Sequence, residues 1–126
     1  MKYLIAVLLV ALTSSFAAPA PIALETRFVL KVGQSAALKN TDWTLTFVRV
    51  VGDSRCRPPA QCLWAGDAEL ELRAKRSSER DTFPFWLNTF SKSSELALRQ
   101  RVTVKSLELP AGNNPARLAT FVVGQP

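Results

Sequence analysis

Apolar and polar side chains alternate along most of this chain. Every second residue is apolar between residues 27 and 32 and again between 43 and 48. The cleanest alternation runs from Ala68 to Lys75, where alanine and leucine alternate with glutamate, arginine and lysine. A period of two places successive side chains on opposite faces of a β-strand. The pattern therefore predicts strands with one face in a core and one face in water.

Similar alternation in the second half of the chain predicts further strands. It covers residues 101–105, 107–109 and 118–123. Residues 96–101 could form a helical turn, but the sequences on both sides favour a strand. Turn-forming residues stand at 39–42, 76–79, 91–94 and 110–115. This spacing predicts an all-β fold, either a single antiparallel β-sandwich of the Ig-like kind or a small barrel, with about seven strands.

The first 17 residues have a different character. Lys2 is followed by an apolar run from Leu4 to Leu12, and the small residues Ser15 and Ala17 precede the predicted cleavage point. This order is typical of a cleavable signal helix. An uncleaved anchor would need roughly 20 apolar residues, and this run is shorter. We therefore predict a signal peptide over residues 1–17 and one β-sandwich domain over residues 18–126.

The net charge gives a modest indication of partners. It is +6 for the whole chain and +5 once Lys2 is removed with the signal peptide. An exported protein, periplasmic or extracellular, rarely meets chromosomal DNA, so we expect no nucleic acid partner and no stable membrane span after processing. The expected partner is an unknown protein or an anionic envelope polymer, with lipid headgroups as another anionic candidate. The alternative is that the charge serves solubility alone.

Cys56 and Cys62 are the only cysteines in the chain, and they lie in a 15-residue connection from Gly52 to Gly66. Connections this long are usually functional or specially ordered. In an oxidising compartment such a pair forms a disulfide, and closing this small ring stabilises the fold by roughly 2 to 2.5 kcal/mol. Pro58 stiffens the ring further. The spacing differs from the Cys-x-x-Cys turn of redox enzymes.

Residues 53–66, which we call the cysteine loop, contain further candidates for a site. Asp53 and Ser54 can accept hydrogen bonds from backbone amides of a turn. Arg55 is placed to pair with a carboxylate such as Asp53 or Asp67. Trp64 precedes a strand, so we expect it to fill the core beneath the disulfide. The alternative is an exposed aromatic side chain that recognises a partner.

The cysteine loop also carries a resemblance. The run Asp53-Ser54-Arg55-Cys56, followed after five residues by Cys62-Leu63-Trp64-Ala65-Gly66, resembles the signature of an uncharacterised family of small exported bacterial proteins. The family pattern is roughly Asp-Ser-Arg-Cys-Pro, four variable residues, and Cys-x-Trp-Ala-Gly. This chain departs from the pattern because Arg57 follows Cys56 and the prolines come later. The resemblance implies export and a β fold, and it implies no activity.

Catalytic chemistry has little support in the sequence. The chain has no histidine, so it lacks the usual general base and the Ser-His-Asp arrangement. Glu69 and Glu71 would share a strand face about 6.5 to 7 Å apart, near the lower limit for inverting glycosidases. Arg73 and Lys75 continue that face, so we expect a solvated mixed-charge surface. A calcium site from Asp53, Asp67 and Glu69 lacks a recognised spacing. We predict no enzyme, no cofactor and no metal site.

A second candidate surface lies in the aromatic-rich stretch 82–90. On a strand, Phe83, Phe85 and Leu87 share one face, which we expect to be core. Trp86 lies on the opposite face, which is either a platform for a sugar or a partner or the second apolar side of an edge strand. Pro84 favours an edge position because it lacks an amide donor.

These observations lead to a functional expectation. We expect an exported, non-enzymatic binding or envelope-associated module with a disulfide-pinned loop, and we name Arg55, Arg57, Pro58, Trp64 and Trp86 as candidate binding residues. The alternative is a secreted protease inhibitor that presents the Cys56 to Cys62 ring, because a rigid loop loses less entropy when it docks.

Overall fold

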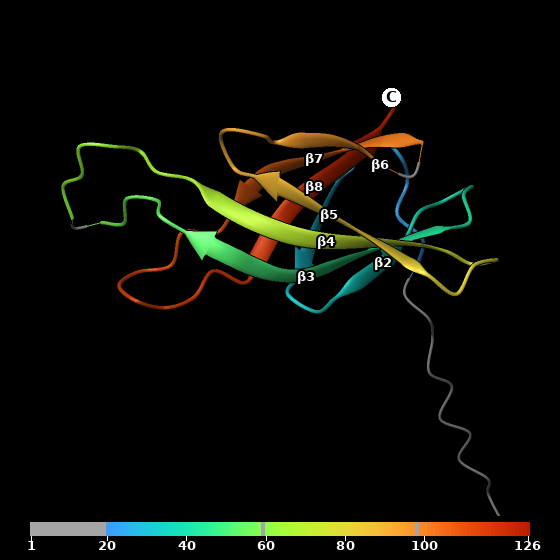
Figure 1. Cartoon of the computed structure of the whole chain (residues 1–126), viewed down its shortest axis with the longest axis horizontal. Coiled ribbons are helices and arrows are strands. Elements are labelled where there is room, and N and C mark those ends of the chain that lie inside the picture. Colours follow the sequence, from blue (N-terminus) through green and yellow to red (C-terminus); the bar gives the residue numbers. More distant parts are fainter. Residues whose placement is uncertain (1–19, 59, 98) are drawn as a thin grey trace, which may run out of the picture.

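A computed structural model describes residues 20–58, 60–97 and 99–126. This part of the chain forms two antiparallel sheets of four strands each, ordered β1-β8-β7-β6 and β2-β3-β4-β5, which pack face to face (Figure 1). The strands are β1 (Arg27–Lys31), β2 (Ser35–Ala37), β3 (Trp43–Asp53), β4 (Ala68–Arg76), β5 (Thr82–Asn88), β6 (Ser94–Ala97), β7 (Gln100–Leu107) and β8 (Leu118–Gly124). The predicted all-β sandwich is confirmed, and the sheets do not close into a barrel. The predicted signal peptide lies outside the described residues.

The core forms where the alternating apolar faces of the two sheets meet. Leu45 and Phe47 of β3 and Leu72 of β4 are fully buried, as are Val102 of β7 and Phe121 of β8. The rings of Phe47 and Phe121 contact edge to face across the sheets, with their centroids 5.6 Å apart. Such aromatic pairs add about 0.5 to 1.5 kcal/mol beyond the burial of their area.

The structure differs from the expected strands in three places, the simplest being that β7 ends at Leu107 and residues 108–109 lie outside the strands. The short strand β2 was not predicted, and the fold has eight strands where about seven were expected. The expected strand over residues 96–101 is divided between β6 and β7 by a turn in which Arg99 has a φ of 56°. Positive φ is uncommon outside glycine, and it allows the chain to reverse between the two strands.

Three connections meet at one end of the sandwich, which we call the loop end. They are residues 54–67 between β3 and β4, 89–93 between β5 and β6, and 108–117 between β7 and β8 (left side of Figure 1). Hydrogen bonds join the first connection to each of the other two. Strand β3 pairs irregularly with β4 at two points in the half that leads to the cysteine loop. Such bulges bend a strand and increase its twist.

Candidate functional site

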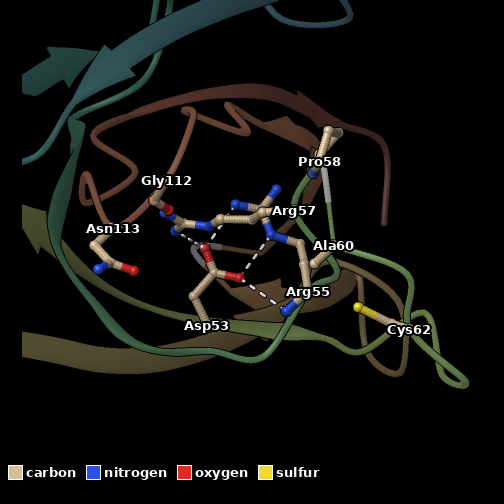
Figure 2. Close-up of a pocket in the computed structure, with 8 residues that line it drawn as sticks. All are labelled: Asp53, Arg55, Arg57, Pro58, Ala60, Cys62, Gly112 and Asn113. Carbon is tan, nitrogen blue, oxygen red and sulfur yellow. Dashed lines mark hydrogen bonds and ion pairs between the residues drawn. The ribbon is translucent and has the colours of Figure 1, made fainter.

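The cysteine loop extends beyond the ends of the sheets (Figure 1). Between it and the connection 108–117 lies a hollow of about 680 Å³. Asp53, Arg55 and Arg57 line one side of the hollow, and Gly112 and Asn113 line the other (Figure 2). The hollow therefore joins residues that are more than fifty positions apart in the sequence.

An ionic cluster forms the floor of this hollow. The Arg55 guanidinium donates from Nε to Oδ1 of Asp53 at 2.8 Å and from Nη2 to Oδ2 at 2.7 Å. Arg57 donates from Nη2 to the same Oδ2 at 3.0 Å. The side chains of Asp53, Arg55 and Arg57 are only 10%, 13% and 19% exposed. One carboxylate therefore neutralises one of two largely buried cations, and the cluster keeps a net charge of +1.

Both arginines also bind backbone carbonyls of the neighbouring connection. Arg55 donates to the carbonyls of Leu107 at 2.8 Å and Glu108 at 2.7 Å. Arg57 donates to the carbonyls of Gly112 and Asn114. These bonds fasten the cysteine loop to residues 107–114. The expected pairing of Arg55 with an aspartate is confirmed, and the partner is Asp53.

The cluster changes the acidity of its carboxyl group. The Arg55 guanidinium, helped by the Arg55 amide and by Arg57, lowers the pKa of Asp53 to about 2 against the opposing effect of burial. A charged hydrogen bond favours the ionised form of an acid. Asp53 is therefore ionised over the whole range in which most proteins are folded.

The two arms of the cysteine loop are fastened to each other as well. The predicted disulfide between Cys56 and Cys62 is present, and its Cα atoms are 5.8 Å apart. Nearer the sheet, the Ser54 amide donates to the Asp67 carbonyl at 2.8 Å, and the Ser54 Oγ accepts a bond from the Asp67 amide at 3.0 Å. The Cys56 amide donates to the Ala65 carbonyl at 3.2 Å. The loop thus has a hydrogen-bonded neck beneath a covalent ring.

Gly66 allows the two arms to approach. Its φ is +70°, and a Cβ at this position would stand 2.0 Å from the carbonyl oxygen of Ser54. A side chain at this position would therefore push the neck apart. This role of Gly66 could not be predicted from the sequence, because the contact depends on the pairing of two arms twelve residues apart.

Asp67 connects the neck to the third connection of the loop end. Its Oδ1 accepts bonds from Thr89 Oγ1 and the Phe90 amide, and its Oδ2 accepts bonds from the amide and hydroxyl of Ser91. Burial raises the pKa of this carboxyl, but the bonds from Ser91, Phe90 and Thr89 outweigh it and hold the pKa well below its ordinary value. Asp67 therefore fixes residues 89–91 against the base of the cysteine loop.

Trp64 does not fill the core, so this expectation was wrong. Its side chain is 82% exposed, and the neighbouring Leu63 is 96% exposed. The physical reason is that the hollow at the base of the loop is lined by the charged side chains of Asp53, Arg55 and Arg57, so it is not an apolar core site for the indole. The exposed alternative for Trp64 is the one observed.

Arg57 and Pro58 occupy different positions relative to solvent. Pro58 is exposed and lines the hollow. Arg57 points inward (Figure 2) and three of its N–H groups donate within the protein. An inhibitor that offers Arg57 to a protease would first have to break these bonds. Pro59 lies outside the described residues.

Strand β5 forms the edge of its sheet, as Pro84 indicated. Phe85 and Leu87 are buried as expected, but Phe83 is 47% exposed. It lines a hollow of about 240 Å³ together with Trp43, and the two rings meet edge to face with their centroids 6.3 Å apart. Trp86 is 44% exposed and opposes Glu71 in the neighbouring strand. Trp86 therefore belongs to the outer face of a sheet and not to the hollow.

Glu71 is buried, with 7% of its surface exposed, so the expectation of a fully solvated face was wrong at this position. Its neighbours in the register are Arg49 and Trp86, which flank it on the two adjacent strands. Arg49 Nε donates to Glu71 Oε2 at 3.0 Å. Within the described residues, no group of three His, Cys, Asp or Glu side chains could hold a metal ion.

Comparisons with protein families, curated proteins and solved structures gave no match. The resemblance to small exported proteins therefore remains a prediction from the motif. No helix in the described part of the chain is long and apolar enough to cross a membrane. The fold and the loop end together define a small antiparallel β-sandwich with one disulfide-closed, multiply fastened loop.

Proposed function

We propose that this protein is an exported, non-enzymatic binding module that recognises a partner through the tip of its cysteine loop. Export is supported by the signal-like amino terminus and by an intramolecular disulfide, which persists in oxidising compartments. The partner of this uncharged tip is a protein of the envelope or the extracellular space.

The exposure of Trp64 and Leu63 is the observation that carries this proposal. Residues 58–66 contain no charged side chain, so the tip offers apolar surface to the surroundings. Exposed tryptophan is enriched among residues that dominate binding energy. A loop that is already fastened loses little conformational entropy when a partner binds.

Arg55 and Arg57 support this role indirectly. Their guanidinium groups bind Asp53 and backbone carbonyls of the neighbouring connection. They act as positioning residues, because they hold the arms of the loop while its tip remains free to contact a partner.

The proposal can be tested with the lipid-free protein fraction of the envelope from the cells that produce the protein, so that binding to phospholipid does not contribute. Labelled wild type, Trp64→Ala and Trp86→Ala are titrated against this fraction, and the bound protein is measured. We expect Trp64→Ala to weaken binding at least about tenfold, as removal of a hot-spot tryptophan does, and Trp86→Ala to bind nearly as wild type. Equal binding of wild type and Trp64→Ala would contradict the proposal, whereas inhibition of secreted proteases by the purified protein would support the alternative function.

A further inference from the structure

We propose that the outer face of the sheet β1-β8-β7-β6 docks onto a membrane surface that contains anionic phospholipids. This surface is separate from the cysteine loop, and the inference does not depend on the function proposed for that loop. It rests on the distribution of charge, on the spacing of the strands and on a shallow hollow in the face.

Four cations share this face. Arg27 and Lys31 come from β1, and Arg101 and Lys105 come from β7. All four side chains are exposed. None of the ion pairs found among the described residues involves any of them. Arg101 makes one long contact, at 3.4 Å, with the hydroxyl of Ser94. Their charges are therefore available to an anionic partner.

The opposite outer face of the sandwich is different. There, Arg73 and Lys75 share β4 with Glu69 and Glu71, and Glu71 pairs with Arg49 of β3. The second sheet thus mixes positive and negative side chains on its outer face. The excess positive charge is therefore concentrated on one side of the molecule, which general solubility would not require.

The cations are spread over an area instead of along a line. Residues four apart on one strand are separated by about 13 Å, and β1 and β7 stand about 10 Å apart because β8 lies between them. In the register of the sheet, Arg27 of β1 and Thr103 of β7 both pair with Val122 of β8. Arg27 therefore lies level with the midpoint between Arg101 and Lys105. A plane of anions, such as a layer of headgroups, can meet all four charges at once, whereas one extended polymer strand would meet fewer.

A shallow hollow on this face can hold a phosphate group. It has a volume of about 270 Å³, and Arg101, Thr103 and Lys105 line it. Two cations and a hydroxyl are suitable groups for phosphate oxygens. Glu25 also lines this hollow, and its Oε1 accepts a hydrogen bond from the Gln125 amide. One carboxylate therefore offsets part of the positive charge at this hollow.

Apolar side chains stand beside the cations, Val29 between Arg27 and Lys31 and Leu118 opposite Lys31. Val29 of β1 is 55% exposed, and Leu118 of β8 is 43% exposed. Apolar surface flanked by lysine and arginine suits the boundary between headgroups and acyl chains. A strongly hydrated anionic polysaccharide would gain less from these two side chains, so we assign the face to a lipid surface.

The test uses vesicles and the purified protein with its disulfide intact. Binding is measured by co-sedimentation with vesicles of equal amounts of phosphatidylglycerol and phosphatidylcholine, and with vesicles of phosphatidylcholine alone. Two variants lose two positive charges each: Arg101→Gln with Lys105→Gln on the proposed face, and Arg73→Gln with Lys75→Gln on the opposite face. A second variant of the proposed face, Arg27→Gln with Lys31→Gln, tests β1 independently.

We expect binding to the anionic vesicles only, and weaker binding at higher salt. Each cation near such a surface contributes about fivefold to partitioning, so each pair on the proposed face should reduce the partition coefficient about 25-fold. The Arg73 and Lys75 pair should have a much smaller effect, and Trp64→Ala should bind as wild type. Equal losses in all three double variants, no binding to anionic vesicles, or binding to dextran sulfate without binding to vesicles would each overturn the inference.

Discussion

Replacing Asp53 with asparagine removes the only negative charge between two largely buried guanidinium groups and keeps the size of the side chain. In the wild type, three arginine N–H groups donate to this carboxylate. After Asp53→Asn, Arg55 and Arg57 face each other without a counter-ion. The arm of the cysteine loop that carries both arginines should then lose its charged hydrogen bonds to the end of β3.

The structure gives two ways to estimate the cost. Breaking a buried ion pair costs about 3 to 5 kcal/mol, and the residual 13% and 19% exposure of the arginines lowers that range. The shift in the pKa of Asp53 from 3.8 to about 2 corresponds to about 2 kcal/mol. We therefore expect a loss of about 2 to 3 kcal/mol in the free energy of unfolding. In a domain of this size the melting temperature should fall by roughly 10 to 15 °C.

The assay is urea unfolding of wild type, Asp53→Asn and Asp81→Asn at several pH values. Asp81 is an exposed aspartate in the connection between β4 and β5, and it serves as the matched control. Because the folded-state pKa of Asp53 is lowered, its contribution is complete above pH 4 and is lost as the pH falls towards 2. The gap between wild type and Asp53→Asn should therefore shrink over this interval. The reasoning would be refuted if Asp53→Asn lowered the free energy of unfolding no more than Asp81→Asn does, or if its effect did not change with pH.

Three further predictions concern the fastening of the loop end. Replacing both Cys56 and Cys62 with serine should lower the unfolding free energy by about 2 kcal/mol; unchanged urea stability would contradict an ordering role for the disulfide. Gly66→Ala should destabilise the fold by about 1 to 3 kcal/mol more than Gly33→Ala. Both glycines have a positive φ, but of the two only Gly66 has backbone atoms within 4 Å of an added Cβ. Equal losses of stability for the two variants in thermal unfolding would argue against the tight neck. Asp67→Asn should speed amide exchange of Phe90 and Ser91, and unaltered exchange there would show that Asp67 does not hold residues 89–91.

The strands could be predicted from the sequence because each sheet has a buried and an exposed face. The alternation over residues 68–75 appears in the structure as the buried side chains of β4. The three residues of β2 offered too short a pattern to be recognised. The division between β6 and β7 was missed because the turn depends on the positive φ of Arg99, which is not a typical turn residue.

The candidate site was predictable only where its contacts are local. The disulfide and the pairing of Arg55 with Asp53 connect residues close together in the chain. The position of Trp64 was predicted wrongly, because it depends on what fills the base of the loop. That space is lined by charged side chains such as Arg57, which contacts residues more than fifty positions away. Sequence spacing alone does not show which distant connection will meet a loop.

The fastened cysteine loop holds Trp64 in solvent. The fluorescence of Trp64 alone measures both the exposure and the motion of its indole ring. In a variant with Trp43→Phe and Trp86→Phe, Trp64 is the only tryptophan, and both acrylamide quenching and the decay of anisotropy report on it alone. We predict quenching close to that of free tryptophan, together with an anisotropy decay that follows the tumbling of the whole domain. A shielded Trp64, or one that reorients much faster than the domain, would contradict the account.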